Sequence, residues 1–428
     1  MAQNKKITFL EKRLLFLILI FAFAIRLFRI DHPRTYVFDE VYHGFTAQEM
    51  AKANVKAWEW WNTPPEGFAF EWTHPPLAKL IMTSSILLWG QNHNQAQFAF
   101  RFPAVFFGTG VVFLTYLLAK TIFKNKNIAL MAAFFTSVDG LFLTMSRIGM
   151  ADIYFLFFSL LTILLALKGK HFYAAIGLGL AIATKWTGIY LGPIIGIILL
   201  YQLYQTAKLT KEHKKQVVIL LSSNILKWLI AFLVIPAVIY LSVYIPFFTS
   251  GHTWAQFTEL QRQMWWYHTN LKATHQYQSA AYTWPLMLRP VWFWVDYQKN
   301  KIANIYNLGN PWLWWTGVLI LPSAIFQAVR NLRQKENFSL ILTLFAYFIF
   351  WVPWIFSPRI MFLHHYLPSL PFLFILIAWR LDKIKKPLIT NCYLLIALIL
   401  FLFFYPINIG LGLPQDWLKY WFWLTSWR

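Results

Sequence analysis

Long apolar runs separated by short clusters of lysine and arginine constrain this chain more than any other feature of its sequence. A helix that crosses a bilayer needs about 20 predominantly apolar residues. Hydrophobic residues make up 58% of the 428 residues and charged residues 13%, against about 45–50% and about 25% in soluble domains. We therefore expect an all-α polytopic membrane protein in a single domain, residues 1–428. About eleven spans are predicted, at 10–29, 98–121, 128–145, 153–167, 172–184, 188–204, 226–245, 312–329, 340–356, 367–379 and 393–407.

The basic clusters predict which ends of these spans share a side of the membrane. They fall in alternate connections, and cytoplasmic connections are the ones enriched in lysine and arginine. This pattern places the N-terminus in the cytoplasm and the C-terminus outside, and it explains a net charge of +22 without a nucleic-acid partner. The clusters are Lys5, Lys6, Lys12 and Arg13; Lys120, Lys124 and Lys126; Lys168 and Lys170; Lys208, Lys211, Lys214 and Lys215; Arg330, Arg333 and Lys335; and Arg380, Lys383, Lys385 and Lys386.

The first span is expected to remain as a membrane anchor. No small-residue cleavage site follows the apolar run that starts at Leu14, so the run does not resemble a cleavable signal. The single cysteine, Cys392, excludes an internal disulfide.

Two long connections, residues 31–97 and 246–311, fall on the predicted outer side. In the first, residues 43–57 have the pattern of a helix lying in the membrane interface. The segment from His74 to Lys79 opens a second helix, since proline suits a first helical turn, and its apolar run 80–89 is too short to span. The many tryptophans and tyrosines of the second connection are typical of an interfacial aromatic belt.

Asp39 and Glu40 are the first candidates for chemistry. They lie between Val37-Phe38 and Val41 at a membrane boundary, where an unpaired charge is costly and partners must exist. A solvated acidic turn is the alternative. Because neighbouring residues in a turn or strand usually point in different directions, only one of the two is expected to reach a reacting atom.

Basic residues on the predicted outer side are the next candidates. Arg26 ends the first span, where snorkelling to the interface is the alternative, and Arg101 lies near the start of the second. Arg147 and Asp152 bracket one outer turn and could simply pair with each other. Lys185 opposes the positive-inside trend, so it has a stronger claim to a role such as phosphate binding.

Metal binding is not expected to be essential. His364 and His365 are adjacent and lack the spacing of a helical metal pair, and the chain contains no HExxH motif. Asp139 lies within a predicted span. An intramembrane carboxylate is a functional candidate by default, and a hydrogen bond to a neighbouring helix is the alternative.

These residues lie in an ordered set of motifs that resembles the protein O-mannosyltransferase family. The set covers nearly the whole chain. It comprises Phe38-Asp39-Glu40-Val41 with Gly44, His74-Pro75-Pro76-Leu77-Ala78-Lys79, Arg101-Phe102-Pro103-Ala104, Ser146-Arg147 with Asp152, Lys185-Trp186-Thr187-Gly188, and Phe362-Leu363-His364-His365-Tyr366-Leu367-Pro368. Motifs of the later loop, such as Tyr267-His268-Thr269-Asn270-Leu271 and Gly309-Asn310-Pro311, resemble the bacterial branch. The soluble luminal domain typical of eukaryotic members is not visible, which also points to a bacterial member.

The resemblance implies a GT-C glycosyltransferase fold and an inverting transfer of mannose from a polyprenyl-phosphate carrier to serine or threonine hydroxyls of proteins. It implies a multi-pass protein of the bacterial cell membrane with an extracytoplasmic active site, acting on secreted or membrane proteins, with the secretion machinery as a candidate partner. Asp39 takes the role of catalytic base and Glu40 that of acceptor binding. The donor phosphate or sugar is assigned to Arg26, Arg101, Lys185, His74, Lys79, Arg147, Asp152, His365 and Tyr366.

General chemistry agrees with one essential carboxylate. The attacking hydroxyl must lose a proton to a base, whereas the phosphate leaving group departs without a protonating acid, unlike the leaving group of glycoside hydrolysis. Nearby cations stabilise the developing charge. Two other functions stay open at this point: transfer to a glycolipid or other envelope polymer, and transport. Transporters often place their sites at the midplane between related halves, and this sequence shows neither feature.

Overall fold

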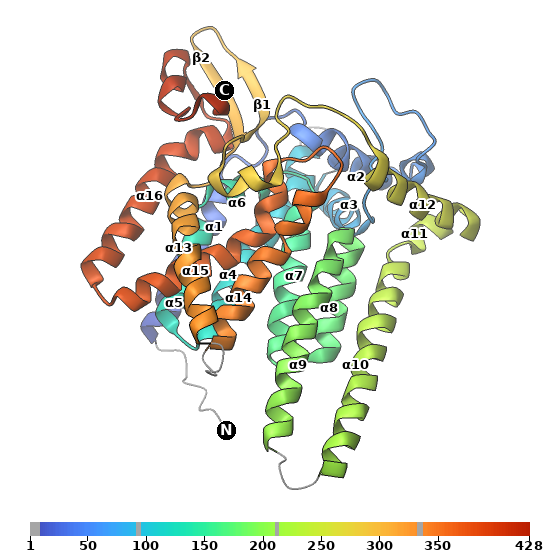
Figure 1. Cartoon of the computed structure of the whole chain (residues 1–428). Coiled ribbons are helices and arrows are strands. Elements are labelled where there is room, and N and C mark those ends of the chain that lie inside the picture. Colours follow the sequence, from blue (N-terminus) through green and yellow to red (C-terminus); the bar gives the residue numbers. More distant parts are fainter. Residues whose placement is uncertain (1–8, 91–95, 210–213, 332–336) are drawn as a thin grey trace.

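The computed structural model of the chain describes residues 9–90, 96–209, 214–331 and 337–428. A helix lies at each of the eleven predicted spans (Figure 1). The predicted basic residues Lys5, Lys6, Lys211, Arg333 and Lys335 lie outside the described residues. The helices in question are α1 (Phe9–Leu27), α4 (Ala96–Phe123), α5 (Lys126–Ser137) with α6 (Gly140–Met145), α7 (Asp152–Leu167), α8 (His171–Thr184), α9 (Leu191–Leu209), α10 (Lys214–Ser242), α13 (Pro311–Arg330), α14 (Asn337–Ile349), α15 (Leu370–Ile384) and α16 (Pro387–Ile409).

Six helical segments of the described chain are long and apolar enough to cross a membrane by length and composition. They include α4, α13 and α16, and α7 and α8 are shorter apolar helices. The chain is therefore a multi-pass membrane protein, while the number eleven for its crossings remains a prediction. Apolar side chains such as Leu229, Leu233 and Val238 of α10 are exposed, as expected of a helix that faces lipid.

The third predicted span, residues 128–145, forms two helices instead of one. The break falls at Asp139, whose Oδ1 accepts a hydrogen bond from the backbone of Phe142 (3.0 Å) and caps α6. Its Oδ2 accepts from the backbone of Asn310 and the indole of Trp314, each at 2.8 Å. Asp139 thus joins the start of α6 to the start of α13. Of its two predicted roles, the hydrogen bond to a neighbouring helix is confirmed.

The two ends of the helical bundle differ in chemistry. Helix ends joined by the basic connections lie together at the lower end in Figure 1, and both long connections and the C-terminus lie at the other end. There, α2 (His43–Ala51), the 3₁₀ turn η2 (Val55–Trp58) and α3 (Leu77–Trp89) follow the first span. The helix α2 covers the first part of the interfacial helix predicted at 43–57. Helix α3 begins directly after Pro76, as predicted.

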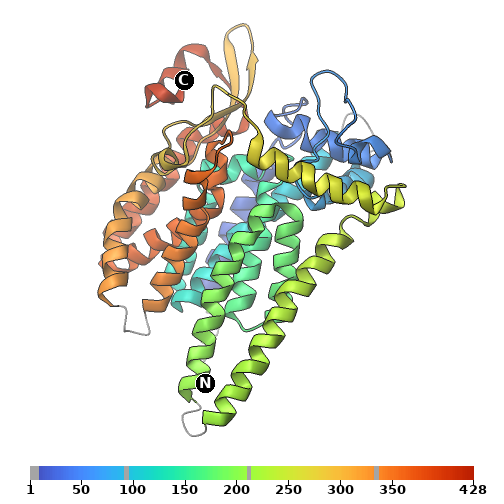
Figure 2. The ribbon, with the colours of Figure 1, turned by 45° about the vertical axis from the view of Figure 1, so that its right-hand side comes forward.

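The second long connection carries α11 (Ile245–Thr249) and α12 (Trp254–Asn270), and Figure 2 shows α12 lying across the direction of the long helices. A 3₁₀ turn, η5 (Ala281–Leu286), follows, and then a sheet that the all-α prediction missed. Its antiparallel order is β1-β2-β3, formed by β1 (Val291–Tyr297), β2 (Lys301–Asn307) and β3 (Gly412–Pro414). Aromatic and β-branched residues favour strands. The composition of this connection instead predicts a membrane belt for its tryptophans and tyrosines. Further 3₁₀ turns are η4 (Trp186–Tyr190), η6 (Val352–Phe356), η7 (Leu363–Ser369), η8 (Gln415–Tyr420) and η9 (Thr425–Trp427).

Candidate active site

A short 3₁₀ turn, η1 (Phe38–Val41), carries the Asp39–Glu40 pair. Phe38 adopts a left-handed backbone conformation with a φ of 49°. Such a conformation costs a non-glycine residue about 1–3 kcal/mol. Its ring stacks on Phe293 of β1 with centroids 4.3 Å apart and meets the edges of Phe362 and His364. Aromatic packing from distant segments therefore holds the strained turn in place.

Glu40 fixes the other side of this turn. The side chain is fully buried, and Arg101 donates to both carboxylate oxygens at 2.8 and 2.6 Å. The backbone N–H groups of Gly149 and Val37 complete the set, each at 2.8 Å. Since both oxygens are paired inside the protein, Glu40 positions Asp39, and the geometry does not support its predicted role in acceptor binding.

Arg101 is also part of the scaffold around η1. Besides Glu40, its guanidinium donates to the backbone carbonyls of Ile30 (3.2 Å), Pro33 (2.8 Å) and Thr35 (2.9 Å). The buried side chain thereby ties the segment that leads into η1 to helix α4. Its guanidinium already has protein acceptors, and its predicted contact with the donor stays a prediction.

Arg26 and Arg147 likewise lie in the packing of the first helix. The Nε of Arg26 donates to the hydroxyl of Ser146 at 2.8 Å, and the side chain is fully buried. Arg147 donates to the carbonyls of Ile25, Arg26, Phe28 and Arg29 at 2.6–3.2 Å. Arg147 thus binds carbonyls at the end of α1 and just after it, and among the described residues the ion-pair partner of Asp152 is Lys185. The predicted donor contacts of Arg26 and Arg147 stay predictions.

Asp39 itself is half-buried and faces a group of charges from four segments. Burial raises the pKa of its carboxyl from 3.8 to about 7, and repulsion by Asp152 and Glu71 adds to this, whereas Lys185 and Arg359 act in the opposite direction. A carboxyl with a pKa near the working pH is suited to accept a proton as a general base.

Lys185 and Asp152 form a buried ion pair, with Nζ 2.8 Å from Oδ1. Lys185 ends α8 and Asp152 begins α7, so the pair joins two helix ends beside Asp39. Lys185 still lines a cavity of about 290 Å³, as its predicted role requires. Asp152, which was assigned to the donor as well, compensates the charge of Lys185.

Glu71, for which the sequence predicted no role, organises the segment from His74 to Lys79. Its carboxylate contacts the ammonium of Lys79 and accepts from the Nδ1 of His74 at 2.9 Å. Burial alone would raise the pKa of Glu71, but Lys79, His74 and His43 lower it well below its usual range. Lys79 is buried and also donates to the carbonyls of Glu71 and His74 at 2.7 and 2.9 Å. Lys79 therefore holds this segment together, and its predicted donor contact stays a prediction.

Arg359 is the cation that the sequence analysis overlooked. Its Nη1 lies 3.0 Å from Nδ1 of His268, and its Nη2 lies 3.3 Å from Nε2 of His365. Burial lowers the pKa of His268 to about 4, so this ring is a neutral acceptor, and no carboxylate of the described chain lies within ion-pair distance of Arg359. The guanidinium keeps an uncompensated charge in the cavity. Like Lys185, it is a basic residue against the positive-inside trend, and that signal could have found it.

The cavity between these cations has one polar wall and one apolar wall. His74, Lys185, His268 and Arg359 form the polar part. The rest is lined by Trp186, Thr187, Ile189, Tyr190, Trp265, Pro353, Trp354, Phe356 and Ser357. Ile189, Trp265 and Phe356 are 64–80% exposed, so the cavity opens toward an apolar surface. An anion with a hydrophobic tail fits this arrangement.

The side chains of two further predicted site residues, His365 and Tyr366, have different surroundings. His365 bonds to Arg359, and burial lowers its pKa well below its usual range, so it acts as a neutral partner of the guanidinium. Tyr366 is fully buried, and its hydroxyl lies 2.5 Å from that of Tyr347. The side chain belongs to the core, and its predicted contact with the donor stays a prediction.

One group of three side chains within the described ranges has the spacing of metal ligands. Ligand atoms of His43, Glu71 and His74 all lie within 4.8 Å of one another. The ammonium of Lys79 contacts the same carboxylate, and a cation so close opposes binding of a divalent ion. These residues fit a metal poorly.

Two family models match the chain. Residues 16–251 match the model described as dolichyl-phosphate-mannose-protein mannosyltransferase. Residues 253–427 match the model of the C-terminal four-transmembrane region of protein O-mannosyltransferase. Together the two matches include η1, α12 and the segment that holds Arg359.

Curated relatives and solved structures give the same direction. A polyprenol-phosphate-mannose–protein mannosyltransferase of Mycolicibacterium smegmatis is 24% identical over 83% of this chain and 82% of its own length. One of the same name from Corynebacterium glutamicum is 22% identical, over 92% and 88%. The S. cerevisiae protein O-mannosyltransferase Pmt1–Pmt2 complex bound to the sugar donor matches with a TM-score of 0.82 and 16% identity, over 99% of this chain and 93% of that chain. ArnT from Cupriavidus metallidurans bound to undecaprenyl phosphate matches with 0.55 and 15%, over 89% and 62%.

Proposed function

Because this chain belongs to the dolichyl-phosphate-mannose-protein mannosyltransferase family, we propose that it moves mannose from a polyprenyl-phosphate-mannose donor to serine or threonine hydroxyls of secreted or membrane proteins. It is a mannosyltransferase with the predicted GT-C glycosyltransferase fold. The observation that carries the finer proposal is the position of Asp39, a carboxyl with a pKa of about 7 facing Lys185 and Arg359.

In the proposed reaction, Asp39 takes the proton of the acceptor hydroxyl as its oxygen attacks the anomeric carbon of the donor. The bond between that carbon and the phosphate oxygen breaks as the new glycosidic bond forms, so the configuration inverts. The electron pair leaves with the lipid phosphate, and the proton remains on Asp39. One carboxylate is enough, because the leaving group departs as an anion without a protonating acid.

Arg359 is our principal candidate for binding that phosphate. A guanidinium can bind a phosphate through two parallel hydrogen bonds, and neutral His268 and His365 orient it without cancelling its charge. Lys185 stands on the same cavity and shares its charge with Asp152. Together the two cations stabilise the charge that develops on the leaving phosphate.

The apolar side of the cavity is our candidate for the start of the polyprenyl tail. Ile189, Trp265 and Phe356 surround its opening and remain largely exposed. Contact with an isoprenoid chain would remove this apolar surface from water or headgroups. Names of the bacterial relatives, which specify a polyprenol-phosphate-mannose donor, support the same carrier class.

We propose that the site end of the bundle faces the extracytoplasmic side of a bacterial cell membrane, with the N-terminus in the cytoplasm. The support is the segregation of basic helix connections at the end opposite the two long connections (Figure 1), together with the positive-inside rule. Acceptors would then reach the site after export, so the secretion machinery is the expected source of acceptor proteins. Transfer is expected to need no divalent metal.

The test is an assay of the purified chain with radiolabelled polyprenyl-phosphate-mannose and two classes of acceptor. Label in a serine/threonine peptide, released by β-elimination, supports the proposal. If the label appears only in a glycolipid acceptor, the acceptor is a lipid and not a protein, and the chain is still a glycosyltransferase. Mass spectrometry of exported proteins provides the cellular readout, because hexose on serine or threonine should disappear when the gene is deleted.

A further inference from the structure

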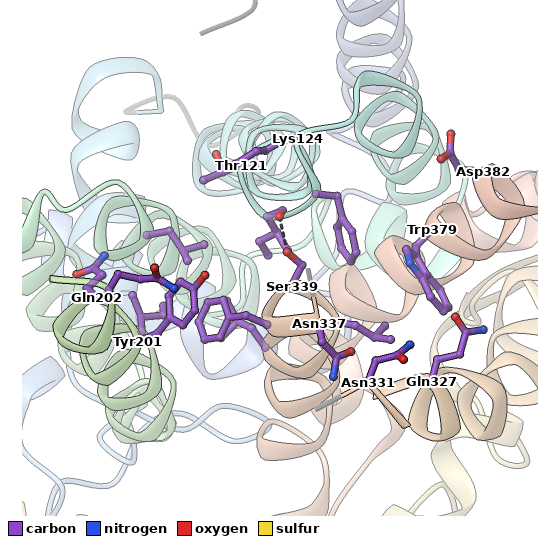
Figure 3. Close-up of a pocket in the computed structure, with 18 of the residues that line it drawn as sticks. Thr121, Lys124, Tyr201, Gln202, Gln327, Asn331, Asn337, Ser339, Trp379 and Asp382 are labelled. Carbon is purple, nitrogen blue, oxygen red and sulfur yellow. Dashed lines mark hydrogen bonds between the residues drawn. The ribbon is translucent and has the colours of Figure 1, made fainter. Parts of the chain in front are cut away.

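A cavity of about 940 Å³ lies at the end of the bundle opposite Asp39. Figure 3 shows it between the ends of α4, α9, α13 and α15 and the start of α14. None of its lining residues belongs to the cavity beside Asp39. The proposed glycosyl transfer therefore leaves this cavity without a role.

The wall of the cavity is rich in amide and hydroxyl groups that are held in place by neighbouring helices. Gln202 donates to the carbonyl of Ala166 at 2.8 Å, and Ser339 donates to that of Ile122 at 2.6 Å. These bonds fix polar groups from different helices around one space (Figure 3). Such a wall is preorganised to hydrogen-bond a polar ligand.

One polar atom in this wall lacks a partner. The Nε2 of Gln205 is buried and makes no hydrogen bond within the described part of the chain. A buried amide N–H without an acceptor is unfavourable, and nearly all such groups in folded proteins are satisfied. An acceptor oxygen from a ligand in the cavity would satisfy Gln205.

The charge of the lining favours an anion. Lys124 and Lys383 contribute two ammonium groups, and Asp382 contributes one carboxylate. Asp382 accepts from the amide of Asn125 at 2.9 Å, and Lys383 donates to the amide oxygen of Gln327 at 2.7 Å. Neither lysine forms an ion pair among the residues that the structure describes.

The depth and the apolar part of the lining favour a lipid over a free anion. The cavity lies where the long helices end, which is the level of the phospholipid headgroups. Leu167, Ile198 and Leu342 line it together with Phe338, whose ring stacks on Tyr201 at 3.6 Å. A ligand that combines a phosphate, hydroxyl groups and the start of an acyl chain would match all three parts of the surface.

We propose that this cavity binds the phosphoglycerol headgroup of an anionic phospholipid from the adjacent leaflet. The phosphate contacts Lys124 and Lys383, and an oxygen of the headgroup accepts from Gln205. Basic pockets between the cytoplasmic ends of membrane helices are known to take anionic headgroups. The inference does not depend on the transferase reaction, because the site lies at the other end of the bundle.

The experiment is native mass spectrometry of the full chain released from micelles that contain phosphatidylglycerol or phosphatidylcholine. The wild type should retain phosphatidylglycerol in preference to phosphatidylcholine. Lys383→Gln should lower that retention about fivefold, the effect of about 1 kcal/mol for one lysine near an anionic headgroup. Lys386→Gln, an exposed lysine on the same end that does not line the cavity, is the matched control.

A second variant, Gln205→Leu, tests the buried amide. It should weaken retention while transfer activity stays at the wild-type level, which separates this site from the catalytic one. Equal retention of the two lipids, or unchanged retention in both variants, would overturn the proposal. So would binding of free glycerol 3-phosphate as tightly as the lipid, because the site would then recognise a soluble anion.

Discussion

Glu40 and Arg101 form a buried ion pair with two hydrogen bonds, of 2.8 and 2.6 Å, between the turn that carries Asp39 and helix α4. The residue next to the proposed base is thus a fixed support. Its carboxylate has four donors within the protein, counting Gly149 and Val37.

Glu40→Gln is expected to lower both stability and turnover. The change leaves the Arg101 charge buried without its partner, and breaking a buried pair in this way costs about 3–5 kcal/mol. Thermal unfolding of the purified variant should show the loss, and the KM for the acceptor peptide should change little compared with kcat. A selective rise in the acceptor KM with normal unfolding would restore acceptor binding as the role of Glu40.

Asp39→Asn is expected to abolish turnover and to preserve both folding and donor binding. The amide has nearly the same shape but cannot take the hydroxyl proton. Product formation and equilibrium binding of the donor are the two measurements. Asp296→Asn on β1 serves as the control, since that carboxylate accepts a hydrogen bond from Gln298 alone among the described residues, at the surface. Substantial turnover by the Asp39 variant would exclude it as the base.

The pH dependence of transfer should follow the raised pKa of Asp39. Since the base must be ionised, the rate should increase with pH through about 7 and then level off. The folded-state pKa lies above the ordinary value of 3.8, so protonation stabilises the fold and this contribution is lost as pH rises through about 7. The free energies of unfolding of the wild type and of Asp39→Asn should therefore diverge as pH rises from 3.8 to about 7. A flat rate profile across that range would contradict the assignment.

Arg359→Gln is expected to raise the KM for the donor by about tenfold to a hundredfold, the range for losing a hydrogen bond to a charged group. The acceptor KM should stay near the wild-type value. Arg262→Gln is the matched control, because Arg262 is exposed on α12 and, in the described part of the chain, forms an ion pair with Glu259 alone. An unchanged donor KM in Arg359→Gln would move the phosphate site elsewhere.

Removal of divalent metal should leave activity unchanged. Lys79 already neutralises Glu71 in the cluster with His43 and His74, so no ion is needed to hold that carboxylate. Transfer measured after dialysis against EDTA, with and without added Mg²⁺ or Mn²⁺, provides the check. A loss that Mn²⁺ restores would show that the cluster, or another site, holds a metal.

The sequence determined the membrane class, the positions of the helices and the turn with the candidate base. Those features depend on local composition: an apolar run of sufficient length must become a helix in lipid, because its backbone groups have no other partner there. The expectation that only one of Asp39 and Glu40 reaches a reacting atom also had a local basis, since adjacent side chains usually diverge. The choice of Asp39 came from the resemblance to the family. Even α3 could be placed, from its two prolines and its short apolar run.

Only the tertiary structure decided which charged residues remain free to act. Arg26, Arg101, Arg147 and Lys79 look like ligands in the sequence, yet each donates hydrogen bonds to a hydroxyl, carbonyls or a carboxylate of the protein. Arg359 keeps its charge because its neighbours are neutral histidines, one of them ninety-one residues away. A single sequence shows which groups carry charge. Whether a charge is compensated depends on long-range contacts, and in a low-dielectric interior that compensation separates a support from a binding group.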